Sequence, residues 1–202
     1  MSRAACTSGC LQPVGRMVLD GVQEIVGRVG LVAVLNLANL SHLSDPAAAL
    51  KDADLRALRR ALEDLYGRRG GRGVLLRSGR AAFRTFLDQF GEELHLTQTE
   101  VRLQPAPVRI QAGLEAITGL LAQVGSGPLD FTETPDTWVW TQRGCLWCHP
   151  AESQEPVCQF AVGLLQEYLT WASGKVYHVE ETACKGTGAE ACVFHISKHP
   201  LD

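Results

Sequence analysis

The chain has 202 residues, of which 46% are hydrophobic and 20% are charged, and its formal net charge is −3. This ordinary globular composition excludes an intrinsically disordered chain, and the slightly acidic balance argues against a nucleic-acid partner. No apolar run approaches the roughly 18 residues that a membrane span requires. We therefore expect a cytoplasmic protein with neither a nucleic-acid nor a membrane partner.

The first segment, residues 1–13, is rich in serine and glycine and contains Cys6 and Cys10. It lacks the apolar stretch of a secretory signal, and we predict a flexible tail followed by a single domain over residues 14–202. Disulfides are rare in a reducing compartment. The clustered cysteines further along the chain are therefore better explained as metal ligands or redox groups.

Apolar residues recur at helical spacing through the first half of the chain. The predicted helices cover residues 15–42, with breaks near Gly27 and Gly30, then 55–65, 83–90 and 110–121. The arginine- and glycine-rich run between Gly67 and Arg80 predicts a solvated segment that interrupts them. The phenylalanines of 83–90 have helical spacing, which favours core packing.

The second half changes to a pattern of strands. Residues 129–132 and 137–141 predict two strands joined by a turn at 134–136, with Trp138 and Trp140 facing the same side. A helix follows from Pro156 to Ser173, and then two more strands, 175–182 and 192–197, flank a glycine turn. These elements predict an α+β domain in which a helical first half packs on an antiparallel sheet.

Five of the seven cysteines fall between residues 145 and 192. Cys145, Cys148 and His149 form a C-x-x-C-H string, which is the pattern of covalent haem attachment. Because such attachment normally needs an exported chain, we keep haem as an alternative. A redox pair formed by Cys145 and Cys148 is another.

A longer pattern places one cysteine at a helix start and three acidic or thiol groups around the glycine turn. Thiolates and carboxylates are good zinc ligands, and this set consists of Cys158, Glu181, Cys184 and Cys192. A competing set consists of Cys145, Cys148, Cys158 and Cys184. Free cysteines also serve as small buried apolar residues, and spacing alone does not choose among these interpretations.

Residues 179–194, VEETACKGTGAEACVF, resemble the C-terminal signature of the 4-vinyl-reductase-like domain family. The shared pattern is Glu-x-x-Cys, a glycine turn and Cys-x-Phe, and the segments 156–158, 163–165 and 171–174 also look like family features. The similarity covers most of the chain from about residue 14. It implies a zinc held by Cys158, Glu181, Cys184 and Cys192.

The same resemblance implies a fold shared with vesicle-tethering subunits and haem-based gas sensors, a homodimer, and an internal pocket for a small apolar molecule. We expect aromatic residues to line the pocket, and the candidates are Phe86, Phe90, His95, Phe131, Trp138 and Trp140. Trp138 is the preferred contact, because aromatic sensors of the family place a ligand-contacting tryptophan near this point.

The predicted function is a zinc-containing domain that senses or carries a hydrophobic, aromatic or tetrapyrrole ligand and passes its signal to a separate partner protein. No G-x-G-x-x-G, P-loop or Ser/His/Asp order is apparent, so we expect a binding protein rather than an enzyme. The alternatives are a haem or thiol-redox protein and, since some family members serve bacteriochlorophyll synthesis, an accessory protein or reductase of tetrapyrrole synthesis.

Overall fold

The computed structural model describes residues 12–45, 48, 50–123 and 129–201. The elements are α1 (Gln12–Leu37), η1 (Ser41–Ser44), α2 (Asp52–Phe90), α3 (Thr99–Arg102), α4 (Ala106–Gln123), β1 (Leu129–Glu133), β2 (Thr137–Gln142), α5 (Gln159–Ser173), β3 (Tyr177–Ala183), η2 (Lys185–Thr187) and β4 (Cys192–Pro200). Most of the predicted tail, with Cys6 and Cys10, lies outside the described residues. Within the described ranges no helix is both long and apolar enough to cross a membrane.

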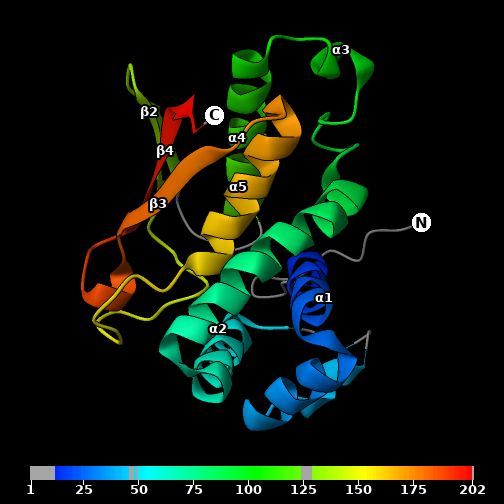
Figure 1. Cartoon of the computed structure of the whole chain (residues 1–202), viewed down its shortest axis with the longest axis vertical. Coiled ribbons are helices and arrows are strands. Elements are labelled where there is room, and N and C mark those ends of the chain that lie inside the picture. Colours follow the sequence, from blue (N-terminus) through cyan, green and yellow to red (C-terminus); the bar gives the residue numbers. More distant parts are fainter. Residues whose placement is uncertain (1–11, 46–47, 49, 124–128, 202) are drawn as a thin grey trace.

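The two long helices each bend at one glycine. Gly27 in α1 has φ 73° and Gly67 in α2 has φ 72°, which confirms the breaks predicted there. The solvated segment predicted after Gly67 is wrong, because α2 resumes and continues to Phe90 (Figure 1). Val74 and Leu75 are buried in the core, and this packing outweighs the low helix propensity of the neighbouring glycines.

Helices α2 and α5 cross at two glycines, so that their backbones nearly touch. A Cβ atom added at Gly79 would lie 2.1 Å from the carbonyl oxygen of Phe160, and one added at Gly163 would lie 2.0 Å from that of Leu76. Only glycine permits such a close approach. The crossing fixes the start of α5 against α2.

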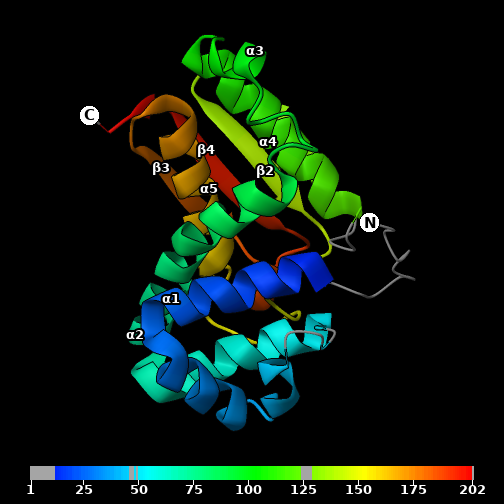
Figure 2. The same cartoon turned by 90° about the vertical axis from the view of Figure 1, so that its right-hand side faces the viewer.

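The sheet has the strand order β1-β2-β4-β3, and every neighbouring pair is antiparallel. Trp138 pairs with Ile196 and Trp140 with Phe194, and both tryptophans are buried on one face, as predicted. Helices α4 and α5 lie against the sheet, while α1 and the first half of α2 lie beyond its lower end (Figures 1 and 2). The predicted α+β architecture is confirmed.

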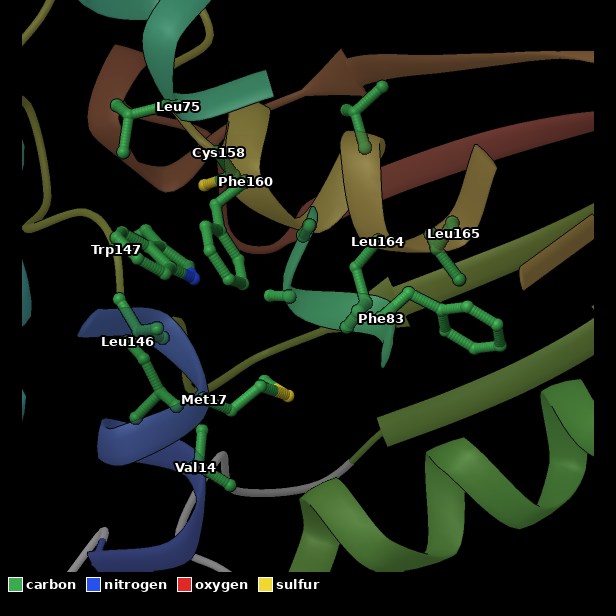
Figure 3. Packing of buried hydrophobic residues seen from close by; sticks show 14 of the residues in the cluster. Val14, Met17, Leu75, Phe83, Leu146, Trp147, Cys158, Phe160, Leu164 and Leu165 are labelled. Carbon is green, nitrogen blue, oxygen red and sulfur yellow. The ribbon is translucent and has the colours of Figure 1, made fainter. Parts of the chain in front are cut away.

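The hydrophobic core joins the helical layer to the sheet. Figure 3 shows Met17 of α1 near Leu146 of the loop that follows β2, with Phe160 of α5 beside Trp147. The phenylalanines of α2 are also buried, and the rings of Phe86 and Phe90 lie 5.4 Å apart. Their predicted role in core packing is confirmed.

Candidate metal centre and adjoining pocket

Three segments that are distant in sequence meet beside the lower end of the sheet. They are the loop 143–152 after β2, the residue before α5, and the turn from the end of β3 to the start of β4. Together they contribute a group that we call the cysteine cluster: Cys145, Cys148, Cys158, Cys184 and Cys192, with Glu181 beside them. All except Cys145 are buried.

The sulfur atoms of the cluster lie within van der Waals distance of one another. The Sγ atom of Cys158 is 3.7 Å from that of Cys192 and 4.0 Å from that of Cys184, and the last two are 4.0 Å apart. On the other side, Cys145 Sγ is 3.3 Å from Cys158 Sγ. Cys148 Sγ is 3.5 Å from Cys192 Sγ. The five described cysteines therefore form one continuous group of thiols.

Glu181 faces the thiols with one oxygen free. Its Oε2 accepts a hydrogen bond of 2.8 Å from the backbone N–H of Cys158, while its buried Oε1 has no partner. Burial, together with the nearby Cys184, raises the pKa of Glu181 to about 8. An unpaired carboxylate oxygen beside buried thiols is a position that a cation would stabilise.

Backbone amides supply the only hydrogen bonds that the described residues donate to the cluster sulfurs, apart from contacts among the thiols. The N–H groups of Trp147, Lys185 and Gly186 point at the Sγ atoms of Cys145, Cys192 and Cys184, at 3.4, 3.4 and 3.3 Å. Burial raises the pKa of the Cys158 thiol well above its usual range. Since no described lysine, arginine or histidine side chain donates to the sulfurs, ionised thiolates here call for a metal cation.

The geometry fits zinc. A tetrahedral ion with Zn–S bonds of about 2.3 Å sets its ligand sulfurs about 3.8 Å apart, and the three distances among Cys158, Cys184 and Cys192 are 3.7 to 4.0 Å. With Glu181 they form one complete group of four donors within 4.8 Å of one another. The structure thus brings together the ligand set that the family resemblance implied.

A second group of four donors overlaps the first. It consists of Cys145, Cys148, Cys158 and Cys192, so the first two cysteines approach Cys192 rather than Cys184 as the competing set proposed. His149 belongs to neither group: its side chain is exposed and its backbone N–H donates to Glu152. All six histidines of the chain are exposed.

A buried arginine fixes the loop that carries Cys145 and Cys148. Arg59 of α2 is 3% exposed, and its Nε donates to the carbonyl oxygen of Trp147 at 3.0 Å. Its guanidinium also pairs with Glu63 at 2.9 Å and Glu152 at 2.8 Å. Sequence reasoning missed this residue, although an arginine beside Leu58, on the apolar face of the predicted helix, was a usable signal.

A small apolar cavity of ≈ 40 Å³ adjoins the cluster. Its walls include Met17, Trp140, Gln142, Leu146, Trp147 and Phe160. The ring of Trp147 stacks on that of Phe160, with centroids 4.7 Å apart (Figure 3). The indole Nε1 of Trp140 is buried without a partner. The cavity therefore offers a hydrogen-bond donor in an otherwise apolar setting.

The predicted pocket residues are only partly gathered there. Trp140 lines the cavity, whereas Trp138 is buried further along β2 with Lys198 Nζ 5.4 Å from its ring centre. Phe131 is half-buried on β1, and Phe86 and Phe90 pack into the core of α2. His95 is exposed and has φ 59°. The prediction missed Leu146, Trp147 and Phe160, although each stands within two residues of a cluster cysteine.

A larger and more open groove of ≈ 460 Å³ lies between α1, α2 and α5. Phe83 and Trp171 line its apolar part, and Arg77, Arg80 and Arg84 are among its charged residues. It shares no lining residue with the cavity beside the cluster. The arginines do face solvent, as the sequence predicted.

Comparison with known families bears on the region that holds the cluster. Residues 138–198, from β2 through most of β4, match the model of the 4-vinyl-reductase (V-4-R) domain. This segment carries the signature of a 4-vinyl-reductase domain. Every cluster residue and the cavity residues Trp140, Leu146, Trp147 and Phe160 fall within it. The predicted resemblance to 4-vinyl-reductase-like domains is confirmed. No curated protein matches the chain at a significant level.

Solved structures of H-NOX proteins share the fold of the whole chain, including the helices before the 4-vinyl-reductase segment. An H-NOX structure concerned with haem distortion has a TM-score of 0.61 and 14% identity, covering 94% of this chain and 95% of that one. An H-NOX protein from S. oneidensis in the Fe(II)NO state gives 0.56 and 13%, covering 91% and 98%. An oxygen-binding H-NOX domain related to soluble guanylate cyclases gives 0.55 and 12%, covering 94% and 95%. This likeness shows a common fold.

Proposed function

We propose that the chain is a zinc-containing domain that binds a small aromatic molecule in the cavity beside the cysteine cluster and acts as a sensor or carrier. One observation carries the proposal: Leu146 and Trp147, which form part of the cavity wall, are the two residues between Cys145 and Cys148. A metal held by the cluster would therefore steady the wall of the binding site.

The residues that would hold the zinc are Cys158, Glu181, Cys184 and Cys192. A bound zinc supplies positive charge that stabilises the thiolates and ties α5 to the β3–β4 turn. The cluster residues then position the loop, and Arg59 holds the same loop from α2 through Trp147 and Glu152. The metal has a structural role in this proposal, and ligand binding takes place in the neighbouring cavity.

The lining of the cavity indicates the class of ligand. Apolar walls favour a hydrophobic ring, and the unpaired N–H of Trp140 favours an acceptor such as a phenolic oxygen. A cavity that holds benzene measures about 150 Å³, compared with ≈ 40 Å³ here. The ligand must therefore displace side chains on entry, and the flexible Met17 is suited to such movement.

Phenol and toluene provide a matched pair of ligands, because only phenol can accept the Trp140 hydrogen bond through its oxygen. Isothermal titration should show that Trp140→Phe weakens phenol binding about five- to tenfold, as expected for one lost hydrogen bond of about 1 kcal/mol, and leaves toluene binding nearly unchanged. Trp138→Phe, which removes a buried indole outside the cavity, is the control. Equal losses for both ligands, or no saturable binding of either, would contradict the proposal.

The fold shared with H-NOX proteins supports haem as an alternative ligand. Because all six histidines are exposed, a haem in the core would take its axial ligand from a cysteine instead. The absorption spectrum of the purified chain decides between the two: a Soret band that persists at one haem per chain favours haem binding. A colourless chain that binds phenol favours the aromatic ligand.

The homodimer and the separate signalling partner remain predictions. Sedimentation equilibrium should give about twice the chain mass of 21.9 kDa if the dimer forms. The same measurement with saturating phenol tests whether the ligand changes assembly. Such a change would favour a sensor, whereas an unchanged assembly would favour a carrier.

A further inference from the structure

The cysteine cluster contains more donors than one ion can use. A tetrahedral zinc takes four ligands, yet five thiols and one carboxylate lie together, in two groups of four that share Cys158 and Cys192. With one zinc bound by the Glu181 group, Cys145 and Cys148 would stay unbound although their sulfurs are 3.3 and 3.5 Å from those of Cys158 and Cys192.

The arrangement has the form of two tetrahedra that share an edge. Such a pair has six corners, two of them common to both, and the cluster supplies six donors with two in common. The shared edge from Cys158 Sγ to Cys192 Sγ is 3.7 Å, close to the 3.8 Å or so expected for sulfurs on one zinc. The other close sulfur distances, 3.3 to 4.0 Å, lie on either side of that value.

The chemistry of the two shared residues agrees with this geometry. A thiolate sulfur has enough lone pairs to bind two cations, whereas the outer ligands need to bind only one. Cys158 and Cys192 are both 0% exposed and lie between the two outer pairs, while Cys145 at the edge is half-buried. Six anionic donors around two Zn²⁺ ions leave the same net charge as four such donors around one.

We propose that the cluster is a binuclear zinc centre. Cys158 and Cys192 bridge the two ions, Glu181 and Cys184 complete the inner site, and Cys145 and Cys148 complete the outer site. The inference rests on the zinc site of the proposed function and adds a second ion to it. The outer ion holds the loop that carries Leu146 and Trp147, so its binding orders the wall of the ligand cavity directly.

The test uses the full chain carrying Cys6→Ser and Cys10→Ser, so that only the described cysteines can bind metal. The reduced, metal-free protein is saturated with Zn²⁺, freed of unbound ions and analysed for zinc per chain by mass spectrometry. We expect two zinc ions per chain in this background. Adding Cys145→Ser and Cys148→Ser should halve the content to one, with the circular dichroism spectrum retained.

The possible counts separate the two proposals. One zinc both in the background and in the outer-site variant overturns the binuclear centre and leaves the single zinc site standing. No zinc in either contradicts both. Iron and acid-labile sulfide in place of zinc in the freshly purified chain would also overturn the binuclear zinc assignment.

A second measurement does not depend on the folding of any variant. Co²⁺ replaces Zn²⁺ in tetrahedral thiolate sites and is paramagnetic. In a bridged pair the two ions couple, so the electron paramagnetic resonance signal should rise up to one Co²⁺ per chain and then fall towards the second equivalent. A signal that doubles at two equivalents would show separate ions and refute the bridge.

Discussion

The crossing of α2 and α5 offers a sharp test of the fold. At Gly163 a Cβ atom would lie 2.0 Å from the carbonyl oxygen of Leu76, whereas ordinary contacts begin near 3.4 Å. Gly163→Ala must therefore push the two helices apart by more than 1 Å. Overpacking of this kind costs typically about 1–3 kcal/mol, and we expect the upper end because the atom met is rigid backbone.

The matched control is Gly119→Ala on the exposed face of α4, where an added Cβ has nothing within 4 Å. The same chemical change should there raise stability by up to about 1 kcal/mol through helix propensity. For a domain of this size, about 3 kcal/mol lowers Tm by roughly 6–12 °C. Thermal unfolding followed by circular dichroism should thus give shifts of opposite sign for the two variants.

The zinc content of the folded Gly163→Ala protein extends the test to the site. Cys158 immediately precedes α5, so a displaced α5 should also weaken metal binding. If Gly163→Ala unfolds within about 2 °C of the unchanged protein, a shift well below the range expected for a clash of this size, the helices do not cross as closely as the structure shows. The account of how α5 places Cys158 would then be refuted.

Three further outcomes follow from buried polar groups. Arg59→Met should lower stability by about 3–5 kcal/mol in urea unfolding, because Glu152 and the Trp147 carbonyl lose their partner; a loss below about 1 kcal/mol would show that the network contributes little. Tyr168→Phe should cost about 1–2 kcal/mol, since the buried hydroxyl donates to two backbone carbonyls; an unchanged midpoint would contradict those bonds. In the metal-free chain the pKa of Glu181, raised by burial to about 8, lies above its unfolded value of about 4.3. Its contribution is complete below that lower value and is lost as the pH rises through about 8, so Glu181→Gln should flatten the fall in stability over this window.

The position of the cavity beside the cluster links metal and ligand binding. Leu146 and Trp147 belong both to the cavity wall and to the loop that Cys145 and Cys148 anchor. If metal orders this wall, zinc must raise the affinity for phenol, and phenol must raise the affinity for zinc by the same factor. Titrations of each in the presence and absence of the other measure that factor.

Short-range patterns in the sequence determined most of the secondary structure. The breaks at Gly27 and Gly67, the turn between β1 and β2 and the shared face of Trp138 and Trp140 all follow from neighbours a few residues apart. Local propensity and side-chain periodicity act over that distance. The same reasoning was wrong for residues 68–80, where burial of Val74 and Leu75 overrides the nearby glycines.

The sequence by itself determined which residue types were available for metal binding, since the spacing of thiols around a glycine turn is a local property. Only the tertiary structure decided that the C-x-x-C loop joins the same cluster, because Cys148 and Cys192 are 44 residues apart. The contact of Arg59 with Trp147, across 88 residues, likewise depends on how α2 packs. Such contacts result from the burial of whole helices against the sheet, and no local pattern records them.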